Sequence, residues 1–126
     1  MEPSLKYPQI RRDLVFFTGE LASSNIKGIW SGDGSNMSGS ENIGYIINFF
    51  YNDTSLAEDP SKYVGLALID SKEVDSMKHL MHSLNSLFDV HGLNLSDLDY
   101  VDKPEWREVS ACARELLQTL KASRVH

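Results

Sequence analysis

The sequence predicts a mainly α-helical fold, a single-domain bundle of about four helices covering residues 1–126. Apolar residues recur at helical spacing in four separate stretches, and several of these stretches follow a typical helix start signal. The length of 126 residues suits one domain, and the 41% hydrophobic and 24% charged residues are close to the averages for globular proteins. The alternative is an α+β fold in which one or two of the apolar stretches form short strands.

The first helix is expected to begin at Pro8, because proline is favoured at a first helical position, where its missing N–H would have no partner. Apolar side chains then form one stripe at Ile10, Leu14, Phe17 and Leu21. Arg11 falls off this stripe and is therefore expected to face solvent. The polar run at 23–25 ends the pattern.

A second helix is predicted to follow a glycine- and serine-rich loop at residues 28–44. Residues 38–41 are Ser-Gly-Ser-Glu, a capping-box pattern that typically precedes a helix. The apolar residues that follow have helical spacing: Ile43, Ile46, Ile47 and Phe50. The stretch 43–51 is also rich in β-branched and aromatic residues, so a buried strand is the alternative there.

The third helix is predicted to begin in the Asp-Ser-Lys-Glu sequence at 70–73, a second capping signature, and to end at Gly92. Between them lies a broad apolar face: Val74, Met77, Leu80, Met81, Leu84, Leu87 and Phe88. The preceding polar stretch 54–61 is typical of a loop. The short apolar stretch 63–69 is either a strand or the first turns of a longer helix, which periodicity alone does not distinguish.

The last helix is expected to have Pro104 at its first position, because the Asp-Lys-Pro-Glu sequence at 102–105 is a start signal. Its apolar stripe is formed by Trp106, Val109, Cys112 or Ala113, Leu116, Leu117 and Leu120. Residues 93–102 alternate apolar and polar, but their Asp and Asn content disfavours a strand. Cys112 is the only cysteine, expected to be an inert packing group, and this cysteine usage suits a reducing, cytoplasmic compartment.

Several classes of protein are disfavoured by the sequence. No apolar run approaches the ~20 residues of a membrane helix, and the N-terminus lacks the order of a secretory signal, so no membrane partner is expected. The formal net charge of −6 disfavours nucleic acid as a partner. Gly34 and Gly39 have P-loop spacing, but Ser40-Glu41 stands where Lys-Ser/Thr would meet the phosphates, so no cofactor is predicted.

One group of side chains has the spacing of metal ligands. Asp75, His79 and His82 share a face of the third helix, and two imidazoles with a carboxylate suit a divalent metal. The alternative is a solvated polar face on which Asp75 pairs with His79. No nucleophile has a recognisable catalytic setting, so no catalytic residue is predicted and an enzyme is not favoured.

Negative charge is concentrated in two loop-rich segments that also carry aromatic residues. Residues 28–60 contain five acidic side chains and no Lys or Arg, and residues 89–105 contain five acidic side chains and one Lys. The residues predicted to bind a partner are Trp30, Asp33, Glu41, Tyr45, Phe49, Asp53, Asp97, Asp99, Tyr100, Asp102 and Trp106. Tyr45 and Phe49 lie off the core stripe of the second helix, so their rings are expected to be exposed; the alternative is that the rings complete the core.

These features predict a small acidic protein-binding module. The partner is expected to be a basic protein, because carboxylates steer the encounter and aromatic rings supply binding energy. An immunity protein that neutralises a basic toxin, such as a nuclease, is the specific hypothesis. The alternatives are a metal-dependent enzyme or metal-binding module, and a homo-oligomer that buries Phe49, Phe50 and Trp106 between copies.

Overall fold

The computed structural model describes residues 5–24, 26, 41–92 and 95–122 of the chain. In these ranges the regular structure is helical and no strand is formed, which confirms the mainly α-helical prediction. The α+β alternative is not needed. The glycine- and serine-rich loop predicted at 28–44 lies largely outside the described residues.

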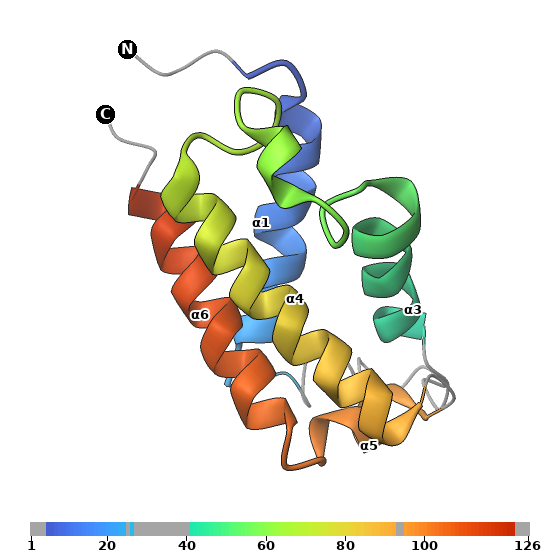
Figure 1. The fold of residues 1–126 in the computed structure, drawn as a ribbon. Helices are drawn as coiled ribbons and strands as arrows, with labels where there is room; N and C mark the ends of the chain where they lie inside the picture. Colours follow the sequence, from blue (N-terminus) through green and yellow to red (C-terminus); the bar gives the residue numbers. More distant parts are fainter. Residues whose placement is uncertain (1–4, 25, 27–40, 93–94, 123–126) are drawn as a thin grey trace.

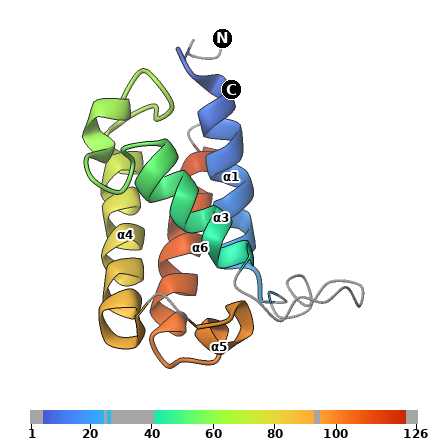
Figure 2. The ribbon, with the colours of Figure 1, turned by 90° about the vertical axis from the view of Figure 1, so that its right-hand side faces the viewer.

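Three long helices form the frame of the molecule: α1 (Pro8–Ala22), α4 (Ser71–His91) and α6 (Trp106–Ala122). α6 packs against both α1 and α4, so it occupies the middle of the bundle. Figures 1 and 2 show that α1 and α4 run in one direction and α6 in the other, which places the starts of α1 and α4 beside the end of α6.

A shorter helical segment lies across one side of this frame. α3 (Glu41–Ile47) continues directly into a π-helix, η1 (Asn48–Asp53), and Figure 2 shows α3 in front of the three long helices. Ile43, Ile46 and Phe50 are buried, so the apolar stripe predicted for a second helix does face the core. The helix prediction for this stretch is confirmed and the buried-strand alternative is wrong.

The apolar stretch at 63–69 forms neither the strand nor the helical turns that were expected. A 3₁₀ helix, η2 (Pro60–Tyr63), is followed by turns, in which the backbone N–H groups of residues 66–68 all donate to the carbonyl of Tyr63. Gly65 has a φ of 86°, which a side chain would disfavour, and Val64 and Leu68 form only an isolated bridge. The stretch is apolar because Ala67 and Leu68 are buried in the core, not because it joins a sheet.

The predicted start and end signals mostly act as expected. Asp70 accepts a hydrogen bond from the backbone N–H of Glu73 at 3.2 Å and so caps α4, which ends at Gly92 with a φ of 78°. α6 begins at Trp106 instead of Pro104, because residues 102–105 form turns first. A short helix that the sequence analysis missed, α5 (Asp97–Val101), is capped by the hydroxyl of Ser96.

Candidate functional site

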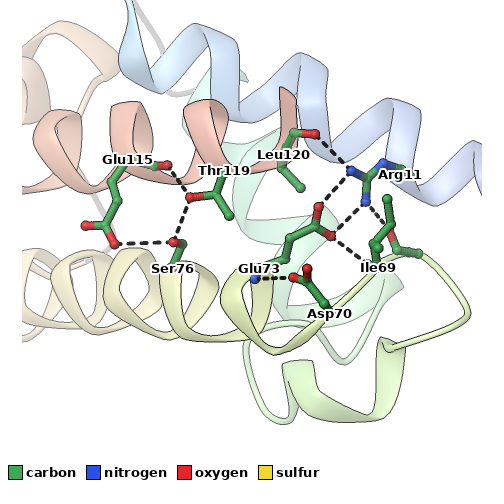
Figure 3. A network of polar contacts seen from close by, with 9 residues as sticks. Arg11, Ile69, Asp70, Glu73, Ser76, Glu115, Thr119 and Leu120 are labelled. Carbon is green, nitrogen blue, oxygen red and sulfur yellow. Dashed lines mark hydrogen bonds and ion pairs between the residues drawn. The ribbon is translucent and has the colours of Figure 1, made fainter. Parts of the chain in front are cut away.

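A buried ion pair joins the starts of α1 and α4 to the end of α6. The guanidinium of Arg11 donates to both carboxylate oxygens of Glu73, at 2.9 and 2.8 Å, and to the carbonyls of Ala67 at 3.0 Å and Leu120 at 3.1 Å. The Glu73 carboxylate also accepts from the backbone N–H of Ile69 at 2.7 Å. Figure 3 shows these contacts, which we call the Arg11 network.

The Arg11 network corrects the prediction that Arg11 faces solvent. The side chains of Arg11 and Glu73 are only 12% and 0% exposed. A charge can be buried in this way when its partners satisfy it fully, and Leu120 supplies one of the carbonyls that the end of α6 would leave unpaired. The network therefore ties the starts of α1 and α4 to the end of α6.

The predicted metal ligands do not come together. His79 lies 3.1 Å from a carboxylate oxygen of Glu115 on α6, so it pairs across the helices and not with Asp75. Asp75, His79 and His82 are exposed, and within the described ranges no three His, Cys, Asp or Glu side chains gather closely enough to hold a metal ion. Metal binding stays a prediction without a ligand geometry in its favour.

Three of the rings predicted to bind a partner are instead part of the core. Phe49 is 6% exposed, Tyr100 is fully buried and Trp106 is 5% exposed. Phe49 packs on Phe17 and Phe50, with ring centroids 5.1 and 5.0 Å apart. Because most of each ring is covered by the chain's own core, these rings do not form the exposed contact surface that was predicted, and the reason given for a homo-oligomer fails with them.

Asp97 is also wrongly placed by the sequence analysis. Its carboxylate is in a residue only 2% exposed and accepts a hydrogen bond from the backbone N–H of Ile43 at 3.0 Å. Asp97 therefore supplies a partner for the first turn of α3, whose N–H groups have none within the helix. Its role is to join α5 to α3.

The other predicted contact residues are either exposed or lie outside the described residues. Trp30 and Asp33, and the side chain of Glu41, lie outside what the structure describes. Exposed residues among the predicted set are Tyr45, Asp53, Asp99 and Asp102. α3 begins beside α5, and η1 leads away from it (Figure 1), so Asp53 lies at the opposite end of this segment from the acids of α5. The exposed acids therefore do not form one continuous face.

An open hollow of about 550 Å³ lies between α1 and the α3–η1 segment. Phe16 and Tyr45, each 60% exposed, and Phe17 and Phe49 supply its aromatic lining. Its remaining described lining residues are Asp13, Glu20, Asn48 and Asp53. We call this site the acidic hollow, because its described lining contains three carboxylates and no basic side chain.

The π-helix shapes one wall of the acidic hollow. Thr54 donates its backbone N–H to the carbonyl of Phe49 at 3.2 Å, a bond that spans five residues. Five residues of an α-helix would turn through about 500° and leave Asn48 and Asp53 about 140° apart. The wider π-helical turn brings both side chains to the same hollow, and π-helical turns occur frequently at functional sites.

Asp13 and Phe16 are among the lining residues that the sequence analysis missed. Asp13 and Phe16 are three residues apart on α1, so they share one face, and both are exposed. Neither residue belongs to the two acidic segments, 28–60 and 89–105, from which the contact residues were predicted. The sequence did contain a signal for this site: Phe16 is a large aromatic residue off the predicted core stripe, and it lies one turn from the carboxylate of Asp13.

The buried cysteine lies away from the acidic hollow. Cys112 is 7% exposed on the face of α6 that packs in the core, as the apolar stripe predicted. Burial raises the pKa of its thiol, and a hydrogen bond to Glu108 raises this pKa further. The thiol therefore stays protonated and poorly nucleophilic at neutral pH.

Tyr51 lies on the other side of η1, facing α4. Its hydroxyl donates to the amide oxygen of Asn85 at 2.7 Å. Burial, followed by the negative charge of Asp89, raises the pKa of Tyr51 to about 12. The phenol is therefore a neutral hydrogen-bond donor that connects η1 to α4.

Fold and surface together define a small all-α domain with a preformed acidic, aromatic hollow. Residues 5–125 match the family described as domain of unknown function DUF7945, and the chain belongs to that family. No curated protein and no solved structure matches the chain. In the part of the chain that the structure describes, none of the helices combines the length and apolar character needed to cross a membrane.

Proposed function

We propose that this protein is a small binding module that recognises a basic protein through the acidic hollow, and that it blocks the partner it binds. The observation that carries the proposal is the pairing of two exposed rings, Phe16 and Tyr45, with the carboxylates of Asp13 and Asp53 in one hollow. Within the described residues neither carboxylate is engaged in an ion pair. Both are therefore free to meet a cation.

The chemistry of the acidic hollow favours a Lys or Arg side chain as its occupant. Carboxylates attract a cation over a distance, and the faces of aromatic rings attract it at contact. Exposed Phe and Tyr rings lose little conformational entropy on binding, so they are typical of residues that dominate binding energy. A toxin that binds phosphates, such as a nuclease, presents Lys and Arg at its own active site, which a module of this kind would cover.

Calorimetry with basic nucleases at low and high salt tests the proposal. We expect a complex whose affinity falls as salt rises, because the carboxylates act partly through long-range attraction. The double variant Phe16→Ala/Tyr45→Ala should weaken this complex by about 30-fold or more, since it removes two contact rings. A nuclease assay should show matching loss of inhibition.

Matched variants separate the acidic hollow from the general surface. Asp13→Asn/Asp53→Asn should reduce the association rate and the salt dependence, whereas Asp75→Asn removes an exposed carboxylate elsewhere and should change neither. Val90→Ala removes an exposed apolar side chain outside the hollow and controls for the loss of the rings. Absence of any salt-sensitive complex, or a complex that the two ring substitutions leave unchanged, would refute the proposal.

A further inference from the structure

A second hollow, of opposite character, lies where α1 ends and α6 begins. Its volume is about 430 Å³, and its described lining includes Ser24, Trp106, Arg107, Ser110 and Arg114. No acidic side chain is among the described residues that line it. We call this site the basic hollow.

The two arginines of the basic hollow lie on one face of α6. Arg107 and Arg114 are seven residues apart, which is two helical turns, and both are exposed. The guanidinium of Arg114 donates to the hydroxyl of Ser110, one turn earlier on α6, at 2.9 Å. Ser110 therefore holds the Arg114 guanidinium toward Arg107. Both guanidiniums are therefore presented at the hollow from a rigid element.

The positive charge of this face is not neutralised by the helix itself. Residues three and four positions from Arg107 and Arg114 are Lys103, Pro104, Ser110, Ala111, Leu117 and Gln118, none of them acidic. Within the described ranges neither arginine forms an ion pair. The adjoining hollow is lined by Arg107 together with Lys103 and Asp102, so one further cation and one carboxylate lie nearby.

The groups that line the basic hollow match the chemistry of a phosphate. Guanidinium groups bind phosphate oxygens through short, charge-assisted hydrogen bonds, and serine hydroxyls add neutral donors. The start of α6 does not itself supply free donors, because the backbone N–H groups of residues 106–108 already donate to the carbonyls of residues 103–105. An anion here would be held by side chains.

We infer that the basic hollow binds the phosphate group of a small phosphorylated ligand. Arg107 and Arg114 hold the phosphate oxygens, and the hydroxyls of Ser24 and Ser110 complete the polar contacts. Trp106, 5% exposed, forms an apolar wall against which the carbon skeleton of a phosphate ester packs. This inference is independent of the acidic hollow and of the proposed inhibitor function.

Fluorescence titration tests the inference, because Trp106 lines the hollow. The sequence contains two tryptophans, so the substitution Trp30→Phe in the full chain leaves Trp106 as its single tryptophan. Titration with inorganic phosphate and with glucose 6-phosphate should give a saturable change below about 10 mM, whereas sodium chloride at matched ionic strength should not. Tighter binding of the ester than of inorganic phosphate would identify the ligand as an ester, and equal binding as free phosphate.

Substitutions in the same background assign the response to the two arginines. Arg107→Gln and Arg114→Gln should each weaken binding at least about tenfold, and Arg107→Lys/Arg114→Lys should retain part of it. Arg12→Gln removes an exposed arginine of α1 outside the hollow and should leave binding unchanged. No saturable change with either probe, or equal affinity in the wild-type and Gln variants, would overturn the inference; circular dichroism checks that each variant is folded.

Discussion

Arg11 and Asp13 are two residues apart on α1, yet the structure uses their charges in opposite ways. Arg11 is buried and meets its counter-charge, Glu73, through two hydrogen bonds, with backbone carbonyls as further partners. Asp13 is exposed and lies in a hollow that contains other carboxylates and exposed rings. The comparison shows that a charge stabilises the fold where its partners are built into the same chain, and is available for recognition where they are not.

The largest expected effect comes from breaking the buried pair. Glu73→Ala leaves the Arg11 guanidinium buried without its carboxylate, and we expect a loss of about 3–5 kcal/mol in the free energy of unfolding. Urea denaturation followed by circular dichroism measures it. Asp75→Ala, an exposed acid on the same helix, should change stability by less than about 0.5 kcal/mol.

Replacing both members of the pair sharpens the comparison. The double variant Arg11→Met/Glu73→Leu removes both charges together, so it should be less destabilised than Glu73→Ala alone. A double variant that unfolds at lower urea than Glu73→Ala would contradict the explanation, because the cost would then arise from lost packing instead of an unpaired charge.

Two phenylalanines of the acidic hollow should respond very differently to truncation. Phe49→Ala removes a ring that is 6% exposed and packs on its neighbours, and it should cost about 3–5 kcal/mol of stability. Phe16→Ala removes a ring that is 60% exposed and should cost less than about 1 kcal/mol. Thermal or urea unfolding of the two variants distinguishes core from contact surface; equal losses would mean that Phe16 is a structural residue.

Among the described residues, α1 contains one buried polar atom that, unlike the Arg11 guanidinium, lacks a hydrogen-bond partner. Thr18 is fully buried, and its hydroxyl has no hydrogen-bond partner in the described structure. Thr18→Val keeps the shape and removes the unsatisfied group, so we expect a gain of about 1 kcal/mol in stability. Thr18→Ser keeps the hydroxyl and leaves a small cavity, and it should destabilise. A loss of stability in Thr18→Val would contradict this explanation.

The smallest expected effect is a pH dependence at the His91–Glu105 contact. A hydrogen bond from His91, at 2.7 Å, lowers the pKa of Glu105 in the folded protein. A lowered native pKa means that the stabilisation is present above the unfolded value of about 4.3 and is lost as the pH falls through the native value. The urea midpoint of wild type should therefore exceed that of Glu105→Gln at neutral pH, and the difference should shrink as the pH falls through the lowered native pKa of Glu105.

Much of the fold was predictable because its signals are local. The capping residue Asp70 and the terminal Gly92 act within one turn of the helix that they bound, so they mark α4 correctly in the sequence. The stripe of α1 was predicted less well. Its buried face includes the Arg11 side chain, which was assigned to solvent because hydrophobic periodicity takes no account of partners on other helices.

The candidate site was predicted in part. Tyr45 and Asp53 were expected to bind a partner, and both line the acidic hollow. Phe16 was missed, and Phe49 was assigned to the exposed surface although it is buried. Phe49 was misassigned because η1 departs from α-helical geometry, so a helical projection at 100° per residue places its side chains on the wrong faces. Phe16 lies on α1, outside the acidic segments from which the contact residues were predicted.

The sequence by itself determined the helical class, the extent of most helices and the excess of negative charge, since spacing, caps and composition are properties of neighbouring residues. Only the tertiary structure decided which charges are paired and which rings are covered. Arg11 finds Glu73 sixty-two residues away, and the acidic hollow forms from α1 and η1, which are distant in the chain. Burial and charge pairing depend on such contacts between distant residues, which no local pattern encodes.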